Sequence, residues 1–395
     1  MSSTNLHIRL IETSEQLLTF CTSAQSASFL TIDTEFMREK TYFPQLCLVQ
    51  VASDVEAVVI DTLSKAINLE PLWRLFMNTS MPKVLHAASQ DLEIFVRTAG
   101  GLPSPLFDTQ VAAMVVGLGD QIGYDKLIKE TVGSVIDKTS RYSDWTLRPL
   151  SKRQIDYAAG DVTHLRDAYT VLIERLTQND RFSWVNEEMT KLCDTSRYQN
   201  DPMNAYKRLK VRTDKTRFIA ILQQLAAWRE AEAQNRDIPR GRVLRDDTLL
   251  DLAGAEPSTV EALRKVRGIT DKMAEGLIGK AIIRAINNGL ATPKDKIFIP
   301  KRKPALTDEQ SAKLSLLKML ASVKAAEVGT ATRLLASTAD LEELARAPVD
   351  DWGGIDISCL KGWRNELFGE AAKALVRGQL WIGFSDGQIT VRNQS

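Results

Sequence analysis

The chain has 395 residues, of which 44% are hydrophobic and 26% are charged, and its formal net charge is +1 at pH 7. This length predicts two or three domains rather than one core, and the composition is that of a soluble globular protein. A membrane protein or a secreted precursor is not expected, because the sequence has no run of about 18 apolar residues and does not begin with a basic and then an apolar region.

The first half of the chain alternates strand and helix signals. Short runs rich in β-branched and apolar residues predict strands at 28–33, 46–52, 57–60 and 83–86. Helical periodicity predicts helices at 91–98, 109–117, 124–131 and 152–176. Because only SDVE separates the second and third strands, we expect a hairpin there and therefore a mixed sheet. This part is predicted to be an α/β domain that ends near residue 185.

The second half is helical in pattern. Helices are predicted at 216–234, 246–255, 258–265 and 271–288. A segment rich in proline and lysine follows at 291–307 and predicts a linker. More helix is expected beyond it, to about residue 378, and the pieces WIGF and QITV near the end are the strand candidates of this half.

The small net charge hides an asymmetry between the halves. Residues 1–200 contain 19 lysines and arginines against 25 aspartates and glutamates, a balance of −6. The remainder contains 32 against 25, a balance of +7. Chance surface variation is one interpretation; the other is that the second half meets a polyanion while the first half holds cations.

Four carboxylates in three motifs are the strongest functional signal: Asp33 and Glu35 in TIDTEF, Asp91 in HAASQDLEIF and Asp161 in YAAGD. Each motif lies at or beside an apolar run, where a charged carboxylate is costly unless something compensates it. Divalent cations are the usual compensation when carboxylates converge, and a pair of such ions is standard apparatus for displacement at phosphorus. The residues also allow plainer interpretations, a strand end for Asp33 and Glu35 and a helix N-terminal acid for Asp91.

The spacing within these motifs gives each pair a common direction. Asp33 and Glu35 are two apart, so both project from one face if the strand continues through them. Tyr157 and Asp161 are four apart, so they share one face of a helix. A phenol beside a metal-binding carboxylate could position an attacking water. Alternatively, Tyr157 packs on the core with Asp161 solvated nearby.

Taken together and in this order, the motifs resemble the DEDD superfamily of 3′-to-5′ exonucleases, in the branch that uses a tyrosine. Three stretches are similar to the ribonuclease D family: residues 143–161 (SDWTLRPLSKRQIDYAAGD), 41–52 and 107–113. The second half resembles HRDC modules, with PRGRVLRDDTLLDLA as the most typical segment. The resemblance implies the following organisation: a ribonuclease H-like α/β exonuclease domain with a mixed sheet at 1–185, an all-α HRDC domain at 211–290, a linker at 291–307, and a second, diverged all-α HRDC-like domain at 308–380.

The resemblance also implies roles for particular residues. Asp33, Glu35, Asp91 and Asp161 would bind two divalent metal ions, Mg²⁺ or Mn²⁺, and Tyr157 would orient the attacking water. The 3′-terminal nucleotide is expected against Phe36, His86 and Gln90. Phosphates farther along the RNA are expected on basic side chains of the second half: Lys207, Arg208, Lys210, Arg240 and Arg242.

The implied activity is trimming of the 3′ ends of structured RNAs, such as transfer RNA precursors, with release of nucleoside 5′-monophosphates. Two alternatives stay open, a 3′-to-5′ exonuclease on DNA and a catalytically silent adaptor that binds RNA. No membrane contact and no obligate protein partner are expected. The four cysteines are far apart and form no CxxC, so we expect reduced thiols and a cytoplasmic location.

Overall fold

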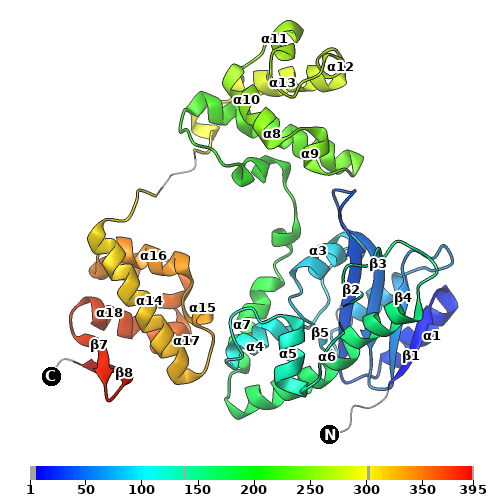
Figure 1. The fold of residues 1–395 in the computed structure, drawn as a ribbon, viewed down its shortest axis with the longest axis vertical. Helices are drawn as coiled ribbons and strands as arrows, with labels where there is room; N and C mark the ends of the chain where they lie inside the picture. The colour runs from blue at the N-terminus through cyan, green and yellow to red at the C-terminus, as the bar shows by residue number, and fades with distance from the viewer. Residues whose placement is uncertain (1–5, 138, 300–302, 394–395) are drawn as a thin grey trace.

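The computed structural model describes residues 6–137, 139–299 and 303–393. Figure 1 shows an α/β domain and two separate helical modules. Residues 300–302 of the predicted linker lie outside the described residues, and the predicted domain boundaries stay predictions. None of the helices among the described residues is long and apolar enough to span a bilayer.

The α/β domain is built on a six-stranded mixed sheet, as predicted. In spatial order the strands are β1 (His7–Ile11), β4 (Glu56–Asp61), β3 (Gln45–Ala52), β2 (Leu30–Met37), β5 (Lys83–Leu85) and β6 (Leu106–Asp108). Strand β3 is antiparallel to both β2 and β4, which confirms the predicted hairpin, and the remaining pairs are parallel. The sequence analysis did not predict β1 and β6.

Helices bury both faces of this sheet. They are α1 (Ser14–Ala24), α2 (Glu70–Met77), α3 (Ser89–Thr98), α4 (Thr109–Val115), α5 (Tyr124–Val132), α6 (Lys152–Gln178) and α7 (Phe182–Leu192). Alternate residues of β4 show the two sides: Val58 joins the core that contains Phe20 of α1, whereas Val59 packs with Ala158 of α6. The long helix α6 therefore crosses one face, and a capping box at Ser151 fixes where it begins.

The first helical module has its own core, in which most side chains are aliphatic. Its elements are 3₁₀ helices at Pro202–Arg208 and Lys294–Lys296 and the α-helices α8 (Thr216–Arg236), α9 (Arg240–Val243), α10 (Asp246–Ala255), α11 (Val260–Arg264), α12 (Asp271–Glu275) and α13 (Leu277–Ala291). The 3₁₀ helix at Thr195–Tyr198 comes before this module and packs on the core of the α/β domain through Tyr198. The single helix predicted at 271–288 is wrong, because Gly276 is extended and separates α12 from α13. At Gly279, an added Cβ would lie 2.0 Å from the Ala274 carbonyl oxygen, so only glycine lets the two helices approach.

The second helical module also has a separate core, which includes Leu317, Trp352 and Phe368. Its elements are α14 (Asp308–Val328), α15 (Thr332–Leu335), α16 (Thr338–Arg346), 3₁₀ helices at Val349–Gly354 and Ser358–Leu360, α17 (Gly362–Arg364), a π-helical turn at Asn365–Gly369, α18 (Glu370–Val376) and the antiparallel strands β7 (Leu380–Ser385) and β8 (Gln388–Asn393). The WIGF and QITV pieces thus form the hairpin that ends the described chain.

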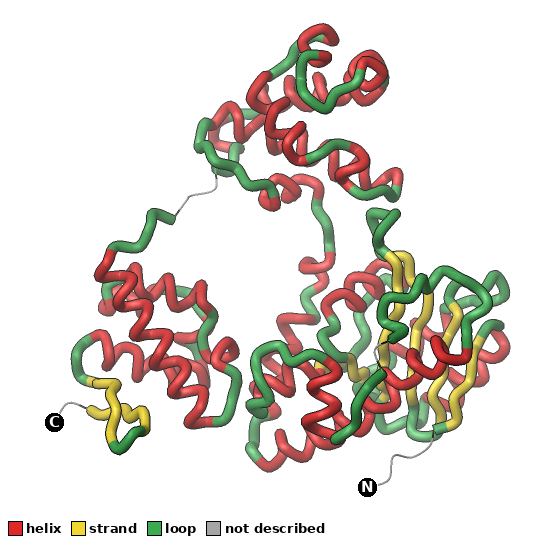
Figure 2. Tube along the Cα trace, in the orientation of Figure 1, coloured by secondary structure: helices red, strands yellow, loops and turns green. Residues whose placement is uncertain are grey.

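The connection between β2 and β3 docks on the first helical module (Figure 2). The hydroxyl of Tyr42 donates a hydrogen bond to Glu230, and Arg240 pairs with the same carboxylate. The backbone N–H groups of Tyr42 and Phe43 both donate to Asp237, over 3.1 and 3.0 Å. We call this contact the Tyr42 joint.

The second module meets the α/β domain through different chemistry. The indole rings of Trp184 and Trp363 stack with centroids 3.9 Å apart and an angle of 4° between their planes. The guanidinium of Arg364, whose side chain is 3% exposed, pairs with Glu187 and Glu188. Both modules are therefore attached directly to the α/β domain as well as through the chain.

Candidate active site

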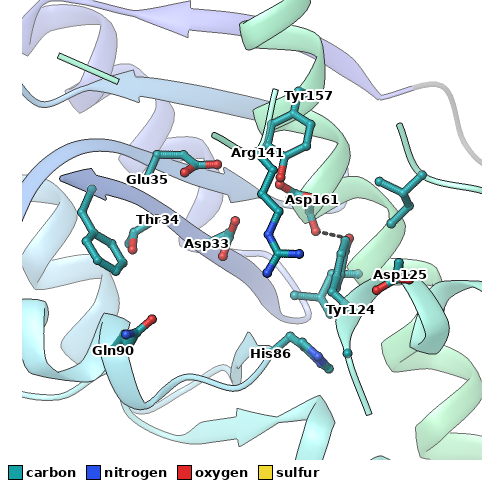
Figure 3. A pocket seen from close by; sticks show the side chains of 14 residues that line it. Asp33, Thr34, Glu35, His86, Gln90, Tyr124, Asp125, Arg141, Tyr157 and Asp161 are labelled. Carbon is teal, nitrogen blue, oxygen red and sulfur yellow. Dashed lines mark hydrogen bonds between the residues drawn. The ribbon is translucent and has the colours of Figure 1, made fainter. Parts of the chain in front are cut away.

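A cavity of about 510 Å³ opens between β2, α6 and the loop that precedes α6 (Figure 3). The lining residues are Asp33, Thr34, Glu35, Phe36, His86, Gln90, Gly123, Tyr124, Asp125, Ile136, Arg141, Tyr157, Asp161 and Leu165. The structure thus brings together four of the five residues for which the sequence predicted catalytic roles, together with all three expected at the 3′-terminal nucleotide.

Three carboxylates converge in this cavity. Asp33 and Glu35 share the face of β2 that lies under α6, as the hydrogen bond from Thr31, two residues earlier, to the Val162 carbonyl shows. Asp161 comes from α6. One oxygen atom from each of the three carboxylates can be chosen so that all lie within 4.8 Å of one another. The strand continues through Asp33 and Glu35, so the predicted common face is present.

The surroundings make the charged state of these groups unfavourable. Burial, and then the charges of Asp161 and Asp91, raise the pKa of Glu35 to about 9. Burial raises the pKa of Asp161 to about 7, and the Tyr157 hydroxyl opposes that rise. The pKa of Asp33 is raised by burial first and then by its three acidic neighbours. A divalent cation would remove this unfavourable charge, and the all-oxygen donor set suits Mg²⁺ or Mn²⁺.

Asp91 lies just outside this group of three. It stands in the first turn of α3 and is 8% exposed. The hydroxyl of Thr34, which points from β2 opposite to Asp33 and Glu35, donates a hydrogen bond to the Asp91 carboxylate. Burial raises the pKa of Asp91 to about 7, while that hydrogen bond lowers it. Asp91 is thus close enough to affect Asp33 and Glu35 electrostatically, but its carboxylate is held by Thr34.

Two tyrosines support the α6 side of the cavity. The ring of Tyr157 stacks on the buried indole of Trp145, with centroids 6.1 Å apart, and its hydroxyl points toward Asp161 (Figure 3). Burial, followed by the charges of Asp161, Glu35 and Asp33, raises the pKa of Tyr157, so the phenol keeps its proton. The hydroxyl of Tyr124 donates to the backbone carbonyl of Asp161 and fixes that turn of the helix.

A strained turn positions the opposite wall. Ala87 has φ of 55°, a conformation that is unfavourable for a residue with a Cβ. The Asp108 carboxylate stabilises this turn by accepting hydrogen bonds from the N–H groups of Ala87 and Ala88, over 3.0 and 2.9 Å. The turn separates His86 from the start of α3, so it sets the directions of His86 and Gln90 together.

Comparison with known proteins places the chain in a family. Residues 8–177 match the family described as 3′-5′ exonuclease, and residues 219–286 match the HRDC domain. Ribonuclease D of Granulibacter bethesdensis is 43% identical over 381 residues, which cover 96% of this chain and 95% of that protein. Ribonuclease D of a Jannaschia species is 45% identical over 385 residues, with coverage of 96% and 98%. The chain belongs to the ribonuclease D family.

The fold agrees with this membership. The crystal structure of Escherichia coli RNase D, described as an exoribonuclease involved in structured RNA processing, superposes with a TM-score of 0.78 at 27% identity. The match covers 94% of this chain and 99% of that one. The likeness therefore extends over the exonuclease domain and the helical region that follows it.

The basic residues predicted to contact RNA differ in their surroundings. Lys207, Lys210 and Arg242 are exposed on the first helical module. The side chain of Arg208 is 56% exposed, donates a hydrogen bond to Asn200 and forms a longer ion pair, of 3.5 Å, with Glu230. Arg240 does not fit its predicted role, because its guanidinium is paired with the buried Glu230 in the Tyr42 joint.

Sequence reasoning missed three residues that build the pocket: Asp108, Tyr124 and Arg141. Asp108 lies within FDTQVAA, a stretch singled out only for its resemblance to the ribonuclease D family. Tyr124 was seen only as the start of a predicted helix. Arg141 lies two residues before the stretch SDWTLRPL, in a loop without periodicity. Tyr124 and Arg141 line the pocket, whereas Asp108 holds the turn at Ala87 that forms its wall. These positions depend on tertiary structure, which no local pattern reveals.

Proposed function

We propose that this chain is a metal-dependent 3′-to-5′ exoribonuclease that trims the 3′ ends of structured RNAs, transfer RNA precursors among them, and releases nucleoside 5′-monophosphates. The observation that carries the proposal is the convergence of Asp33, Glu35 and Asp161, with oxygens within 4.8 Å of one another. The pocket lies inside the segment that matches the 3′-5′ exonuclease family.

The proposed cofactors are two divalent cations, Mg²⁺ or Mn²⁺. Asp33, Glu35 and Asp161 supply one group of oxygen ligands, and Asp91, held nearby by Thr34, supplies a further carboxylate. Bound ions would lower the pKa of a water molecule and stabilise the leaving 3′-oxygen. The raised pKa values of Glu35, Asp91 and Asp161 support this, because burial disfavours the charged form of each carboxyl group and bound cations would offset that cost.

Tyr157 is proposed to orient the attacking water. Its hydroxyl stays protonated, since burial and the neighbouring carboxylates raise its pKa. A phenol can donate one hydrogen bond and accept another, so it can hold a water molecule on one side while it faces Asp161 on the other. The stack with Trp145 restricts the ring to this direction.

The wall formed by Phe36, His86 and Gln90 is proposed to receive the 3′-terminal nucleotide. A bulge in β2 between Glu35 and Phe36 changes the direction of the strand there. The Thr109 hydroxyl donates to the Leu85 carbonyl, so the Nδ1 atom of His86, 3.0 Å away, carries the proton in their hydrogen bond. This hydrogen bond fixes the orientation of the His86 ring in the proposed wall.

The first helical module is proposed to bind the part of the RNA that lies outside the pocket. Lys207, Arg208, Lys210 and Arg242 offer exposed or half-exposed cations for phosphates. Arg242 lies with Arg245 and Arg267 along a second cavity, of about 630 Å³. Because such contacts neutralise phosphates without reading bases, binding should weaken steeply with salt. A cytoplasmic location is proposed with this function, supported by four free cysteines.

The test compares a 3′-extended transfer RNA with a single-stranded DNA of matched length, both labelled at the 5′ end. Each is incubated with Mg²⁺, with Mn²⁺ or with EDTA. We expect metal-dependent shortening of the RNA from its 3′ end that stops near the mature terminus. Faster loss of the DNA would favour a DNA exonuclease, and tight RNA binding without shortening would favour a silent adaptor.

A further inference from the structure

One cation faces the carboxylates of the pocket. Arg141 is the one lysine or arginine among the described residues that line it, and in Figure 3 its side chain extends between Asp33 and Asp161. In the described part of the chain its guanidinium forms no ion pair. It lies over the ring of Tyr142, 5.6 Å from the centroid, and it is close enough to Tyr157 to act electrostatically on that phenol. Asp61, a buried carboxylate elsewhere, does have an arginine partner, Arg148. Arg141 therefore brings an unpaired guanidinium to the reaction centre.

The turn that carries Arg141 is anchored beside α6. Ser140 is 5% exposed, and its carbonyl accepts a hydrogen bond of 3.0 Å from the N–H of Ser143. Two residues farther along, Trp145 is 2% exposed and packs on Tyr157. The backbone of Arg141 is thus held close to the proposed water-orienting residue, while its exposed side chain is free to meet a ligand in the pocket.

The charges expected in the pocket favour one further cation when the substrate is bound. Asp33, Glu35, Asp91 and Asp161 carry four negative charges when ionised, which two divalent cations would neutralise. The negative charge of the phosphodiester then remains, and it grows on the phosphoryl oxygens as water attacks. A guanidinium is planar, stays protonated and can donate two parallel hydrogen bonds to phosphate oxygens. Donors placed where charge develops are among the largest contributors to catalysis.

We propose that Arg141 is a catalytic residue that binds a non-bridging oxygen of the scissile phosphate and stabilises the charge that develops on it. In this step the water oxygen forms a bond to phosphorus and loses a proton to solvent. The bond from phosphorus to the 3′-oxygen breaks, and that oxygen takes up a proton. Arg141 keeps its own proton throughout. The inference rests on the proposed function and adds a residue to it.

The competing role for Arg141 is electrostatic shielding of the carboxylates without contact to substrate. The two roles predict opposite behaviour toward metal and phosphate. A shield competes with divalent cations, so its removal tightens metal binding and leaves the rate at saturating metal unchanged. A phosphate ligand contributes to the rate at saturating metal and to the affinity for the product phosphate, but not to the affinity for a nucleoside.

The test uses the full chain and three variants: Arg141→Ala, Arg141→Lys and, as control, Lys129→Ala, an exposed cation of the neighbouring helix α5. Single-turnover rates are measured on a 5′-labelled single-stranded RNA at saturating Mn²⁺. Calorimetry then gives affinities for Mn²⁺ alone and, with Mn²⁺ present, for AMP and for adenosine. Melting temperatures verify that all variants fold.

For Arg141→Ala we expect a rate about 10²-fold lower, AMP binding weakened about tenfold, and affinities for adenosine and Mn²⁺ that are not reduced. Arg141→Lys should lie between this variant and the wild type, and Lys129→Ala should match the wild type. An unchanged rate for Arg141→Ala, an equal loss for AMP and adenosine, or a loss of Mn²⁺ affinity would each overturn the proposal. A wild-type protein that shortens no RNA would instead overturn the proposed function itself.

Discussion

The Tyr42 joint and the pocket both hold buried carboxylates, and the surroundings of these carboxylates differ. In the Tyr42 joint, Glu230 is 1% exposed, and although burial acts to raise its pKa, hydrogen bonds from Arg240 and Tyr42 keep that pKa below its usual value. In the pocket, Glu35 forms no ion pair with any described residue, and burial and acidic neighbours raise its pKa to about 9. The same chemical group is thus stabilised as an anion in one place and destabilised in the other.

The difference shows how a binding site can be told from a structural contact. A buried charge with full partners fixes the relative positions of the elements that carry it, as Glu230 does for the first helical module. A buried charge without partners costs free energy in the empty protein. Such a group is useful when its partner is a ligand, so the unbalanced carboxylates support the proposed cation site.

The largest effect is expected when a charge is removed from the unbalanced group. Asp33→Asn should lower the exonuclease rate on a short single-stranded RNA by about 10³-fold or more, because an amide cannot replace an anionic ligand in the centre of the cluster. The melting temperature of the metal-free variant should equal or exceed that of the wild type, since repulsion is relieved. Activity within tenfold of the wild type would contradict the assignment of Asp33.

The next largest effect separates metal binding from positioning of water. Tyr157→Phe should lower the single-turnover rate by about 10²-fold, the lower end of what a positioned proton-transfer group contributes. Its Mn²⁺ affinity, measured by calorimetry, should stay within about twofold of the wild type, because the carboxylates are untouched. If Mn²⁺ affinity fell together with the rate, Tyr157 would act on the metal site rather than on water.

The stability of the metal-free protein should depend on pH because of the carboxyl groups in the pocket. Unfolded carboxyl groups titrate near pH 4, whereas the folded pKa values are about 7 for Asp91 and Asp161 and about 9 for Glu35. Between these limits the folded chain binds more protons than the unfolded chain. The stability of the metal-free protein should therefore fall as pH rises from about 5 to about 9.

Metal binding should change with pH in the opposite direction. Cations need ionised carboxylates, so Mn²⁺ affinity should rise by up to about tenfold per pH unit for each proton displaced near pH 7. Urea unfolding in EDTA at pH 5.5 and at pH 8.5, with Mn²⁺ titrations at both, tests the two trends. Stability that rises with pH in EDTA would contradict the described electrostatics of the pocket.

The smallest effect on activity is expected at the joint. Glu230→Gln leaves Arg240 without its anionic partner, so we expect a loss of about 1–3 kcal/mol in the free energy of unfolding. The rate on a short RNA should stay within about twofold of the wild type. Glu232→Gln is the matched control on the same helix, because its pair with Arg236 is 32% and 48% exposed and should contribute less than about 1 kcal/mol. Equal losses in the two variants would remove the distinction between a joint and a surface pair.

Local patterns predicted the helices and strands that have a long apolar run or a clear hydrophobic periodicity. Strand β2 follows from an apolar run that leads into Asp33 and Glu35, and α6 follows from long periodicity that carries Tyr157 and Asp161. Strand β1 was missed because only Ile11 of its five residues is buried, so no alternation is visible. The short β6 was missed because three residues give too little pattern.

The partners of individual side chains could not be predicted in the same way. Arg240 and Arg242 are two residues apart in one basic segment, and nothing local tells that the first pairs with Glu230 while the second is exposed. Arg141 and Tyr124 reach the pocket from loops or helix ends whose positions depend on the whole domain. The sequence thus indicated the carboxylates of the site, but not the residues that form hydrogen bonds or ion pairs with buried carboxylates or that lie opposite them in the pocket.

The most direct test of the account follows the terminal nucleotide itself. A single-stranded RNA labelled only in its 3′-terminal nucleotide is mixed with excess protein, with Mn²⁺ or EDTA, and the first labelled product is identified by chromatography. We predict that the label appears at once as a nucleoside 5′-monophosphate with Mn²⁺, and not with EDTA or with Asp33→Asn. Label that appears first in longer fragments, or equally in EDTA, would contradict the claim that these carboxylates form a metal-dependent 3′-to-5′ exonuclease site.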